Sequence, residues 1–167
     1  PFLGESTTGD GEGLLPSRLA LVVGINNYQT GALTLPQLHA AAQDSDDVAS
    51  ALQKAGFDAP IVVRTNGTRD YVTRNMIFNA INDLNNAAAS SIDSNGKQPV
   101  VLFYFAGHGM SYKGENYILP SDFRPYAAED IPEMGISVSK LLKRLSWGKP
   151  ALKIILIDAC RNYLSQQ

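Results

Sequence analysis

Two apolar segments, the second interrupted only by Lys153, constrain the fold of this chain more than any other feature. They span residues 100–106 and 152–157, and both are rich in the β-branched and aromatic residues that favour strands. Apolar runs of this length, without alternating polar residues, are typical of strands buried on both faces of a parallel sheet. A third run, residues 19–25, has the same character. We therefore expect a parallel sheet that is covered on both faces.

The segments between these strands carry the pattern of amphipathic helices. After residue 36 the apolar side chains fall on one helical face as far as residue 55, so Pro36 suits the first turn and Gly56 a C-terminal cap. Strands and helices thus alternate along the chain. This order predicts an α/β fold, a three-layer sandwich with a mostly parallel β-sheet flanked by helices on both faces.

Further elements are predicted with the same rules. A short strand is expected at residues 61–63, a helix from Ser137, and a turn at 113–116 followed by a strand at 117–119. Residues 120–135 are predicted to form a long acidic loop. A helix starting near Thr73 is expected to bury its apolar side chains, which are Met76, Ile77, Ala80, Ile81 and Leu84.

Size and composition indicate one globular domain. The chain has 167 residues, of which 44% are apolar and 18% charged, with a net charge of −2. The Gly-rich residues 1–17 are predicted to be a flexible arm and residues 18–167 the domain. The low net charge argues against nucleic acid as a partner, and no apolar run approaches the roughly 20 residues that span a bilayer. Without a visible secretory signal we expect a cytoplasmic protein, and the initial proline suggests a piece of a longer chain.

Residues able to do nucleophilic chemistry follow two of the predicted strands. His108 comes after one of them, between two glycines, and Cys160 comes at the end of the last. Because ligands bind beyond the carboxyl ends of parallel strands, neighbouring strands would place thiol and imidazole side by side. The imidazole would then form the thiolate and later protonate a leaving amine. The amides of Gly109 and Cys160 are candidates for an oxyanion hole.

Other interpretations of these residues remain open at this point. A lone cysteine is often a small buried hydrophobe, and Gly-His-Gly is also a tight turn. A flavodoxin-like binding domain with an incidental cysteine would share the same layers, although the chain has no phosphate-binding glycine motif.

In combination, the segments Phe-Ala-Gly-His-Gly (105–109) and Ile-Asp-Ala-Cys-Arg (157–161) resemble the caspase-like cysteine endopeptidases, which include caspases, paracaspases, metacaspases and bacterial homologues. The separation of 160 − 108 = 52 residues matches the spacing of about 50 in the caspase signature. The resemblance extends to residues 21–25, 44–57 and 116–120. It implies that the chain is the large-subunit (p20-like) portion. It also implies a small-subunit (p10-like) segment or chain of the same precursor as a partner, self-processing, and a role in regulated cell death or defence.

The residue two before the cysteine differs from caspases and bears on specificity. Caspases have Gln there, whereas this chain has Asp158, as paracaspases and metacaspases do. The resemblance implies that Asp158 and Asp44, with Ala106 nearby, form an S1 pocket for a P1 arginine or lysine. We expect Asp158 to be buried at its strand end and in need of a partner. Asp44 could instead belong, with Asp46 and Asp47, to a solvated helix face.

No cofactor or metal is expected. The stretch after the histidine that holds an acidic cluster in calcium-dependent metacaspases contains only Glu115 here. The lone His39 is expected to be a surface or packing residue. The acidic residues of the long loop are expected to be solvated, with a cation site as the alternative: Asp122, Glu129, Asp130 and Glu133. A catalytically silent caspase-like interaction module remains the alternative to an enzyme.

Overall fold

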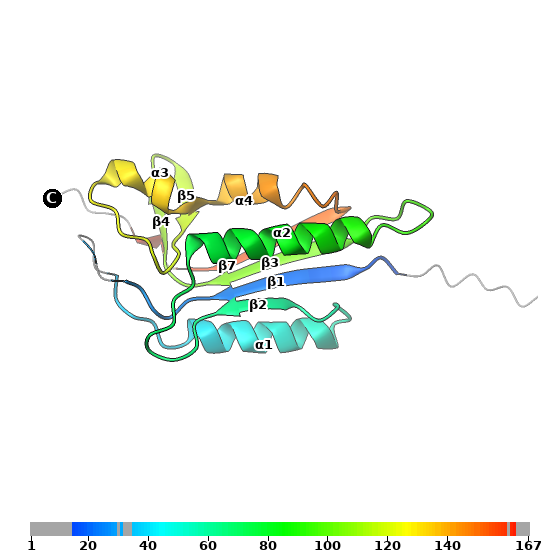
Figure 1. Cartoon of the computed structure of the whole chain (residues 1–167), viewed down its shortest axis with the longest axis horizontal. Coiled ribbons are helices and arrows are strands. Elements are labelled where there is room, and N and C mark those ends of the chain that lie inside the picture. The colour runs from blue at the N-terminus through cyan, green and yellow to red at the C-terminus, as the bar shows by residue number, and fades with distance from the viewer. Residues whose placement is uncertain (1–14, 30, 32–34, 160, 163–167) are drawn as a thin grey trace, which may run out of the picture.

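A four-stranded parallel sheet forms the centre of the protein. The computed structural model describes residues 15–29, 31, 35–159 and 161–162. The strands lie in the order β2-β1-β3-β7 (Figure 1), and each neighbouring pair is parallel. Their bounds are β1 Arg18–Gly24, β2 Ile61–Arg64, β3 Val100–Ala106 and β7 Leu152–Asp158. The predicted parallel sheet is confirmed.

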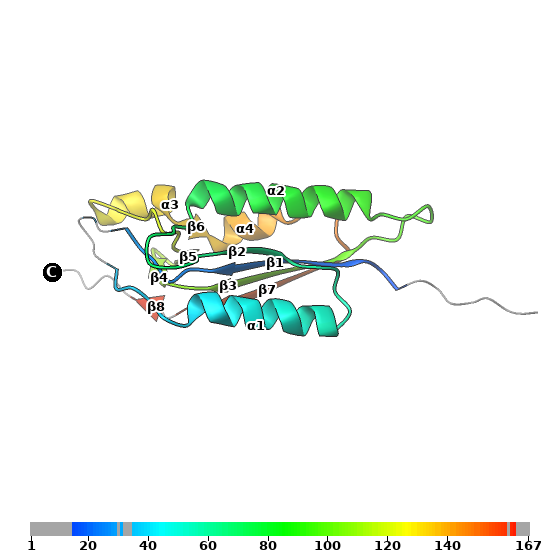
Figure 2. The same ribbon diagram turned by 60° about the horizontal axis from the view of Figure 1, so that its bottom comes forward.

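Helices cover both faces of this sheet. α1 (Ala41–Lys54) lies on one face, and α2 (Arg74–Ser90) and α4 (Val138–Arg144) lie on the other (Figures 1 and 2). Side chains of β1 and β3 alternate between the two layers, and almost all of them are buried. Burial on both faces explains why these strands have no polar alternation. The chain is therefore the three-layer α/β sandwich that the sequence predicted.

β7 is buried less than the sequence predicted. It is the last strand in the order, and among the described residues no strand pairs with its outer edge. Leu152 is 52% exposed, Leu156 47% and Ile157 38%. The expectation of a strand buried on both faces is wrong for β7. Apolar composition alone does not distinguish a central strand from a strand at the edge of the sheet.

A second, smaller sheet lies at the carboxyl end of the central one (Figure 2). Its order is β6-β5-β4-β8, with β4 and β5 forming an antiparallel hairpin. The sequence predicted only one strand here, at residues 117–119, and missed the hairpin because four-residue strands carry little periodicity. Its turn at Lys113 and Gly114 has positive φ angles of 48° and 80°. The strands are β4 Gly109–Tyr112, β5 Glu115–Ile118, β6 Ile136–Ser137 and β8 Arg161–Asn162.

Two helix starts agree with the sequence. Thr73 caps α2, where its hydroxyl accepts the Met76 amide at 3.3 Å, and Ser137 caps α4 by accepting the Lys140 amide at 3.0 Å. Met76, however, is 43% exposed, so the expectation that it packs inward is wrong. The loop 120–135 also contains a short 3₁₀ helix, Ala128–Asp130, and α3, Ile131–Met134.

The first helix begins five residues later than predicted. α1 starts at Ala41 rather than at Pro36, because the preceding backbone makes other contacts. The amide of Leu38 donates to the Asn26 carbonyl at 2.8 Å, and the Asn26 side chain accepts the Ala42 amide at 3.1 Å. The Pro36 carbonyl contacts His108. These contacts keep residues 36–40 in a non-helical conformation next to the end of β1.

Two further expectations concern the N-terminal arm and membrane-spanning helices. Residues 1–14 of the predicted arm lie outside the described residues. In the described part of the chain, no helix combines the length and apolarity needed to cross a bilayer.

Candidate active site

Three strands end at the same level and bring the predicted site residues together. The register pairs Gly24 of β1 with Ala106 of β3, and Ala106 with Asp158 of β7. His108 follows β3 by two residues, and Ala159 follows β7 directly. The prediction that the histidine and cysteine segments are neighbours is therefore confirmed for the strands that carry them.

His108 is held tightly in this structure. It is 5% exposed, and its main-chain N–H donates to the Tyr28 hydroxyl at 2.7 Å. Its Nε2 lies 2.8 Å from the Pro36 carbonyl oxygen. Because a carbonyl only accepts hydrogen bonds, this contact assigns the imidazole proton to Nε2 and leaves Nδ1 as the basic atom.

Tyr28 also packs against the histidine ring. The two ring centroids are 4.6 Å apart, with the planes tilted by 55°. Tyr28 is 1% exposed, and burial raises the pKa of its hydroxyl far above the ordinary value. A Cβ on Gly107 would lie 2.7 Å from both the Tyr28 hydroxyl and the Phe105 ring, so only glycine fits between them. The sequence analysis missed Tyr28, although it lies just beyond β1, where parallel strands deliver ligand-binding residues.

A pocket of about 420 Å³ opens beside the histidine. It gathers four of the residues that the sequence singled out, together with neighbours from the start of α1. Asp44 is half-buried, whereas Asp158 is exposed. The expectation of a buried Asp158 is therefore wrong, since β7 is an edge strand. The lining residues are Leu38, His39, Ala40, Ala41, Asp44, Ala106, Gly107, His108, Asp158 and Ala159.

Neither carboxylate of this pocket forms an ion pair with a described residue. Asp46, two residues after Asp44, is paired with Arg64 at 2.6 Å, so the adjacent acid has a structural partner that Asp44 lacks. Asp44 lines the pocket, whereas Asp46 and Asp47 do not. Two carboxylates without a cation can bind one supplied by a ligand.

The close approach of α1 to β1 places Asp44 in the pocket. A Cβ on Gly24 would clash with the Ala41 carbonyl and lie 2.6 Å from the Ser45 Oγ. Glycine at the end of β1 therefore lets the first turn of α1 cross the strand closely, and this turn carries Asp44.

Tyr104, within the sheet, is subject to the charges of both acids. It shares a strand face with Ala106 and is 7% exposed. Burial raises the pKa of its hydroxyl, and the negative charges of Asp158 and Asp44 and a hydrogen bond to Asp158 raise it further. The Tyr104 hydroxyl therefore stays protonated beside the two carboxylates. Sequence reasoning missed Tyr104, because within an apolar strand it is indistinguishable from a core aromatic.

Cys160 lies outside the described residues, but both of its neighbours are placed. Ala159 lines the pocket beside His108. Arg161 pairs with Gly109 in the parallel β4–β8 register. The backbone on either side of the cysteine therefore runs past the two residues expected to act with it.

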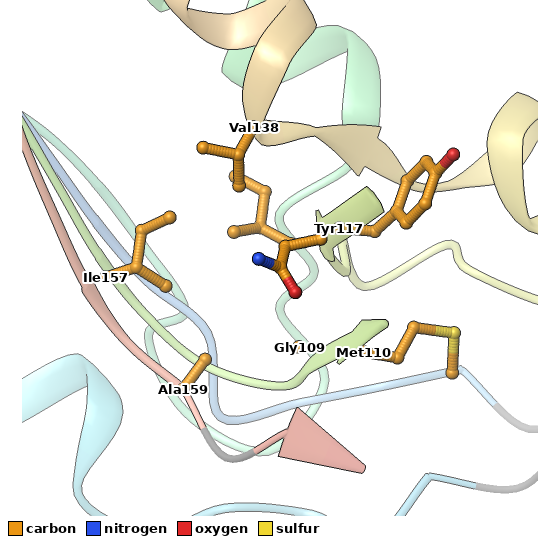
Figure 3. Close-up of a pocket in the computed structure, with 8 residues that line it drawn as sticks. Gly109, Met110, Tyr117, Val138, Ile157 and Ala159 are labelled. Carbon is orange, nitrogen blue, oxygen red and sulfur yellow. The ribbon is translucent and has the colours of Figure 1, made fainter. Parts of the chain in front are cut away.

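A second, smaller pocket of about 170 Å³ lies near the same strand ends. Figure 3 shows Ile157 and Ala159 on the β7 side of it and Val138, at the start of α4, on another side. Gly109, Met110 and Tyr117 of the β4–β5 hairpin complete the labelled wall. Gly109 and Ala159 thus lie close to both pockets.

The remaining candidates are less engaged in the site. His39 is exposed at the wall of the larger pocket. The Asp130 carboxylate accepts the amides of Tyr126 at 2.9 Å and Ala127 at 3.0 Å, which is a local loop role. Over the residues that the structure places, no three His, Cys, Asp or Glu side chains are grouped so that they could hold a metal ion.

Comparison with known proteins now decides the family. The sequence-family model for the caspase domain matches residues 17–167 of this chain. The chain belongs to the caspase domain family. This is a family of cysteine peptidases, and its fold is the one described above.

Individual relatives agree with the caspase domain assignment. The chain is 26% identical over 150 residues to the human mucosa-associated lymphoid tissue lymphoma translocation protein 1; the match covers 89% of this chain and 16% of that protein. A crystal structure of protein GSU0716 from Geobacter sulfurreducens superposes with a TM-score of 0.60 at 20% identity. It covers 87% of this chain and 51% of that one, and supports the fold. The chain thus spans about half or less of the length of these relatives.

Proposed function

We propose that this caspase domain is the large-subunit portion of a cysteine endopeptidase that cleaves proteins or peptides after a P1 arginine or lysine. One observation supports this most: a single pocket contains His108 and two carboxylates, Asp44 and Asp158, that have no cationic partner among the described residues. The proposed acid–base residue and the proposed specificity residues therefore face the same volume.

The proposed catalytic dyad is Cys160 and His108. With its Nε2 proton directed at the Pro36 carbonyl, His108 presents Nδ1 to accept the thiol proton. The resulting thiolate attacks the scissile carbonyl, and the imidazolium then protonates the leaving amine. Water hydrolyses the thioester, and His108 acts as base again in this second half. The buried contacts of the ring keep it in one orientation through both steps.

The oxyanion of the tetrahedral intermediate is proposed to bind the amides of Gly109 and Cys160. The β4–β8 register supports this, because it brings the backbone just after the cysteine next to Gly109. Each such donor typically contributes about 10²–10³ in rate.

The proposed S1 pocket recognises a cation through Asp158 and Asp44. A guanidinium has a fork of donors that two carboxylates can accept together, whereas an aspartate would be repelled. Ala106 is small and lines the same volume, which leaves depth for a long side chain. The pocket lies in front of His108, so a bound P1 residue places its carbonyl beside the dyad.

The proposed partner is a small-subunit-like (p10) segment or chain of the same precursor. The outer edge of β7 supports it, because Leu152 and Leu156 are exposed there and no strand of the described part of the chain pairs with that edge. An apolar sheet edge of this kind is a template for a further strand. Processing of the precursor and a role in regulated cell death or defence belong to this proposal.

Covalent labelling tests the proposed function. The full-length precursor is treated with a peptide chloromethyl ketone carrying P1 arginine, and in parallel with the same peptide carrying P1 aspartate. We expect a stoichiometric mass increase on the Cys160 peptide with the arginine reagent alone, and none in Cys160→Ala. Absence of labelling by both reagents would favour the catalytically silent interaction module, and faster labelling by the aspartate reagent would reject the P1 assignment.

A further inference from the structure

Three described residues between β1 and α1, namely Tyr28, Pro36 and Gln37, form a closed ring of contacts with the histidine. Starting at His108, Nε2 contacts the Pro36 carbonyl at 2.8 Å. That carbonyl belongs to the peptide bond that joins Pro36 to Gln37. The ring continues through Gln37 to Tyr28, and the Tyr28 hydroxyl returns to the His108 amide at 2.7 Å.

The link between Gln37 and Tyr28 is made by two hydrogen bonds. The Gln37 side-chain oxygen accepts the Tyr28 amide at 2.8 Å, and its side-chain nitrogen donates to the Tyr28 carbonyl at 2.8 Å. A paired contact of this kind fixes both the distance and the rotation of the two segments. Gln37 as a residue is exposed and its two hydrogen bonds are partly buried, so its side chain does not belong to the hydrophobic core.

The main chain of the histidine is held from the other side as well. The His108 carbonyl accepts the Leu119 amide at 3.0 Å, so the residue is fixed at N–H, C=O and ring nitrogen. Only the ring contact depends on the position of the Pro36 carbonyl. That carbonyl in turn is placed by Gln37 and, through it, by Tyr28.

We propose that Tyr28 and Gln37 are positioning residues that hold the His108 imidazole in the Nε2–H tautomer and in the orientation needed for acid–base chemistry at Nδ1. This inference rests on the proposed function for its kinetic consequences. The tautomer itself is a property of the resting protein and does not depend on any substrate.

Without the Gln37 side chain, the Pro36 carbonyl is free to move away from the ring. The imidazole then loses the acceptor that selects one tautomer, and part of the population carries its proton on Nδ1, where it cannot take a proton from the thiol. Without the Tyr28 hydroxyl, the His108 amide loses its acceptor and the backbone that carries the ring shifts. Both changes act on the chemical step and leave the carboxylate pocket intact.

The test combines nitrogen NMR of the histidine ring with kinetics on the full-length precursor. Ring-¹⁵N-labelled protein is compared as wild type, Gln37→Ala and Tyr28→Phe, and the His108 signals are those that vanish in His108→Asn. We expect an Nε2–H tautomer in the wild type and a mixture of tautomers in both variants. With a P1-arginine peptide, kcat should fall about 10-fold with KM unchanged, and Gln37→Glu, which keeps one of the two bonds, should lie between Gln37→Ala and wild type.

One control variant and two outcomes make the test decisive. Gln53→Ala, another exposed glutamine at the far end of α1, should leave both the tautomer and kcat unchanged. An unchanged His108 tautomer in Gln37→Ala would overturn the inference even if Tyr28→Phe does not fold. A protein that cleaves no peptide but shows the predicted change of tautomer would contradict the proposed function while supporting the positioning role.

Discussion

The histidine and the carboxylate pair occupy the same pocket but are held in opposite ways. His108 is 5% exposed and has hydrogen bonds at its amide, its carbonyl and its ring. Asp158 is exposed, Asp44 is half-buried, and neither has an ion pair among the described residues. The structure thus fixes the residue proposed to move protons and leaves unpaired the residues proposed to bind a ligand.

This difference follows from the chemistry that each group is proposed to perform. A proton acceptor must keep one tautomer and one direction, so fixed contacts made before substrate arrives favour catalysis. A binding carboxylate that already held a lysine or arginine of its own would have to release it before binding a substrate cation. Asp46, which among the described residues does have such a partner, is bonded to Arg64 and does not line the pocket.

The largest effect on cleavage is expected at His108, the residue that is fixed by hydrogen bonds. His108→Ala removes the acid–base group and should lower kcat about 10³-fold, with KM for a P1-arginine peptide nearly unchanged. Steady-state kinetics measure this change. If kcat falls by this amount and KM also rises strongly, the histidine region also binds the substrate.

A smaller effect on cleavage is expected at the carboxylates that have no ion pair among the described residues. Asp158→Asn keeps the shape but removes one charge, so kcat/KM for P1 arginine should fall about 100-fold, or ~2.7 kcal/mol. Cleavage assays with the purified variant measure this, and Asp47→Asn, an exposed acid on the same helix as Asp44, is the control. If both variants lose activity equally, net charge rather than the pocket is responsible.

The Tyr104 hydroxyl, which is influenced by both acids, should matter less. Tyr104→Phe removes the hydroxyl whose pKa responds to Asp158 but keeps the ring in the sheet. We expect KM for a P1-arginine peptide to rise about 3- to 10-fold, because the carboxylate becomes less well oriented. A fall in kcat at unchanged KM would instead connect Tyr104 to the histidine.

The smallest effect concerns stability at high pH. Burial keeps the Tyr28 pKa in the folded state well above the ordinary value near 10, so above pH 10 the unfolded chain binds fewer protons than the folded one. The free energy of unfolding should then fall by about 1.4 kcal/mol per pH unit for this residue, and not below pH 10. Urea titrations at several pH values above 10 measure how the free energy of unfolding changes with pH. This pH dependence should be weaker in Tyr28→Phe than in wild type, and unchanged in the control Tyr126→Phe, whose side chain is 86% exposed.

Much of the architecture was predictable because it depends on patterns along the chain. Buried runs such as residues 100–106 and cap residues such as Ser137 carry their own local evidence, and both appear as predicted. The strand ends then placed His108, Ala106 and Asp158 around one pocket, and the first turn of α1 added Asp44. The expected nucleophile, Cys160, stays a prediction.

The parts that were not predicted depend on contacts between distant segments. The exposure of β7 and Asp158 follows from strand order, which apolar composition does not encode. The late start of α1 follows from Asn26 and His108, which take up the backbone of residues 36–42. Tyr28 and Tyr104 look like ordinary strand or loop aromatics until the fold places their hydroxyls against His108 and Asp158.

A pair of peptide substrates tests the central claim most directly. The two peptides are identical except that P1 is arginine in one and citrulline, its neutral counterpart of similar shape, in the other. If two unpaired carboxylates beside His108 recognise a P1 cation, kcat/KM should be at least about 100-fold higher for arginine. Equal values for the two peptides would contradict the account, because a pocket that does not distinguish charge cannot be the one described here.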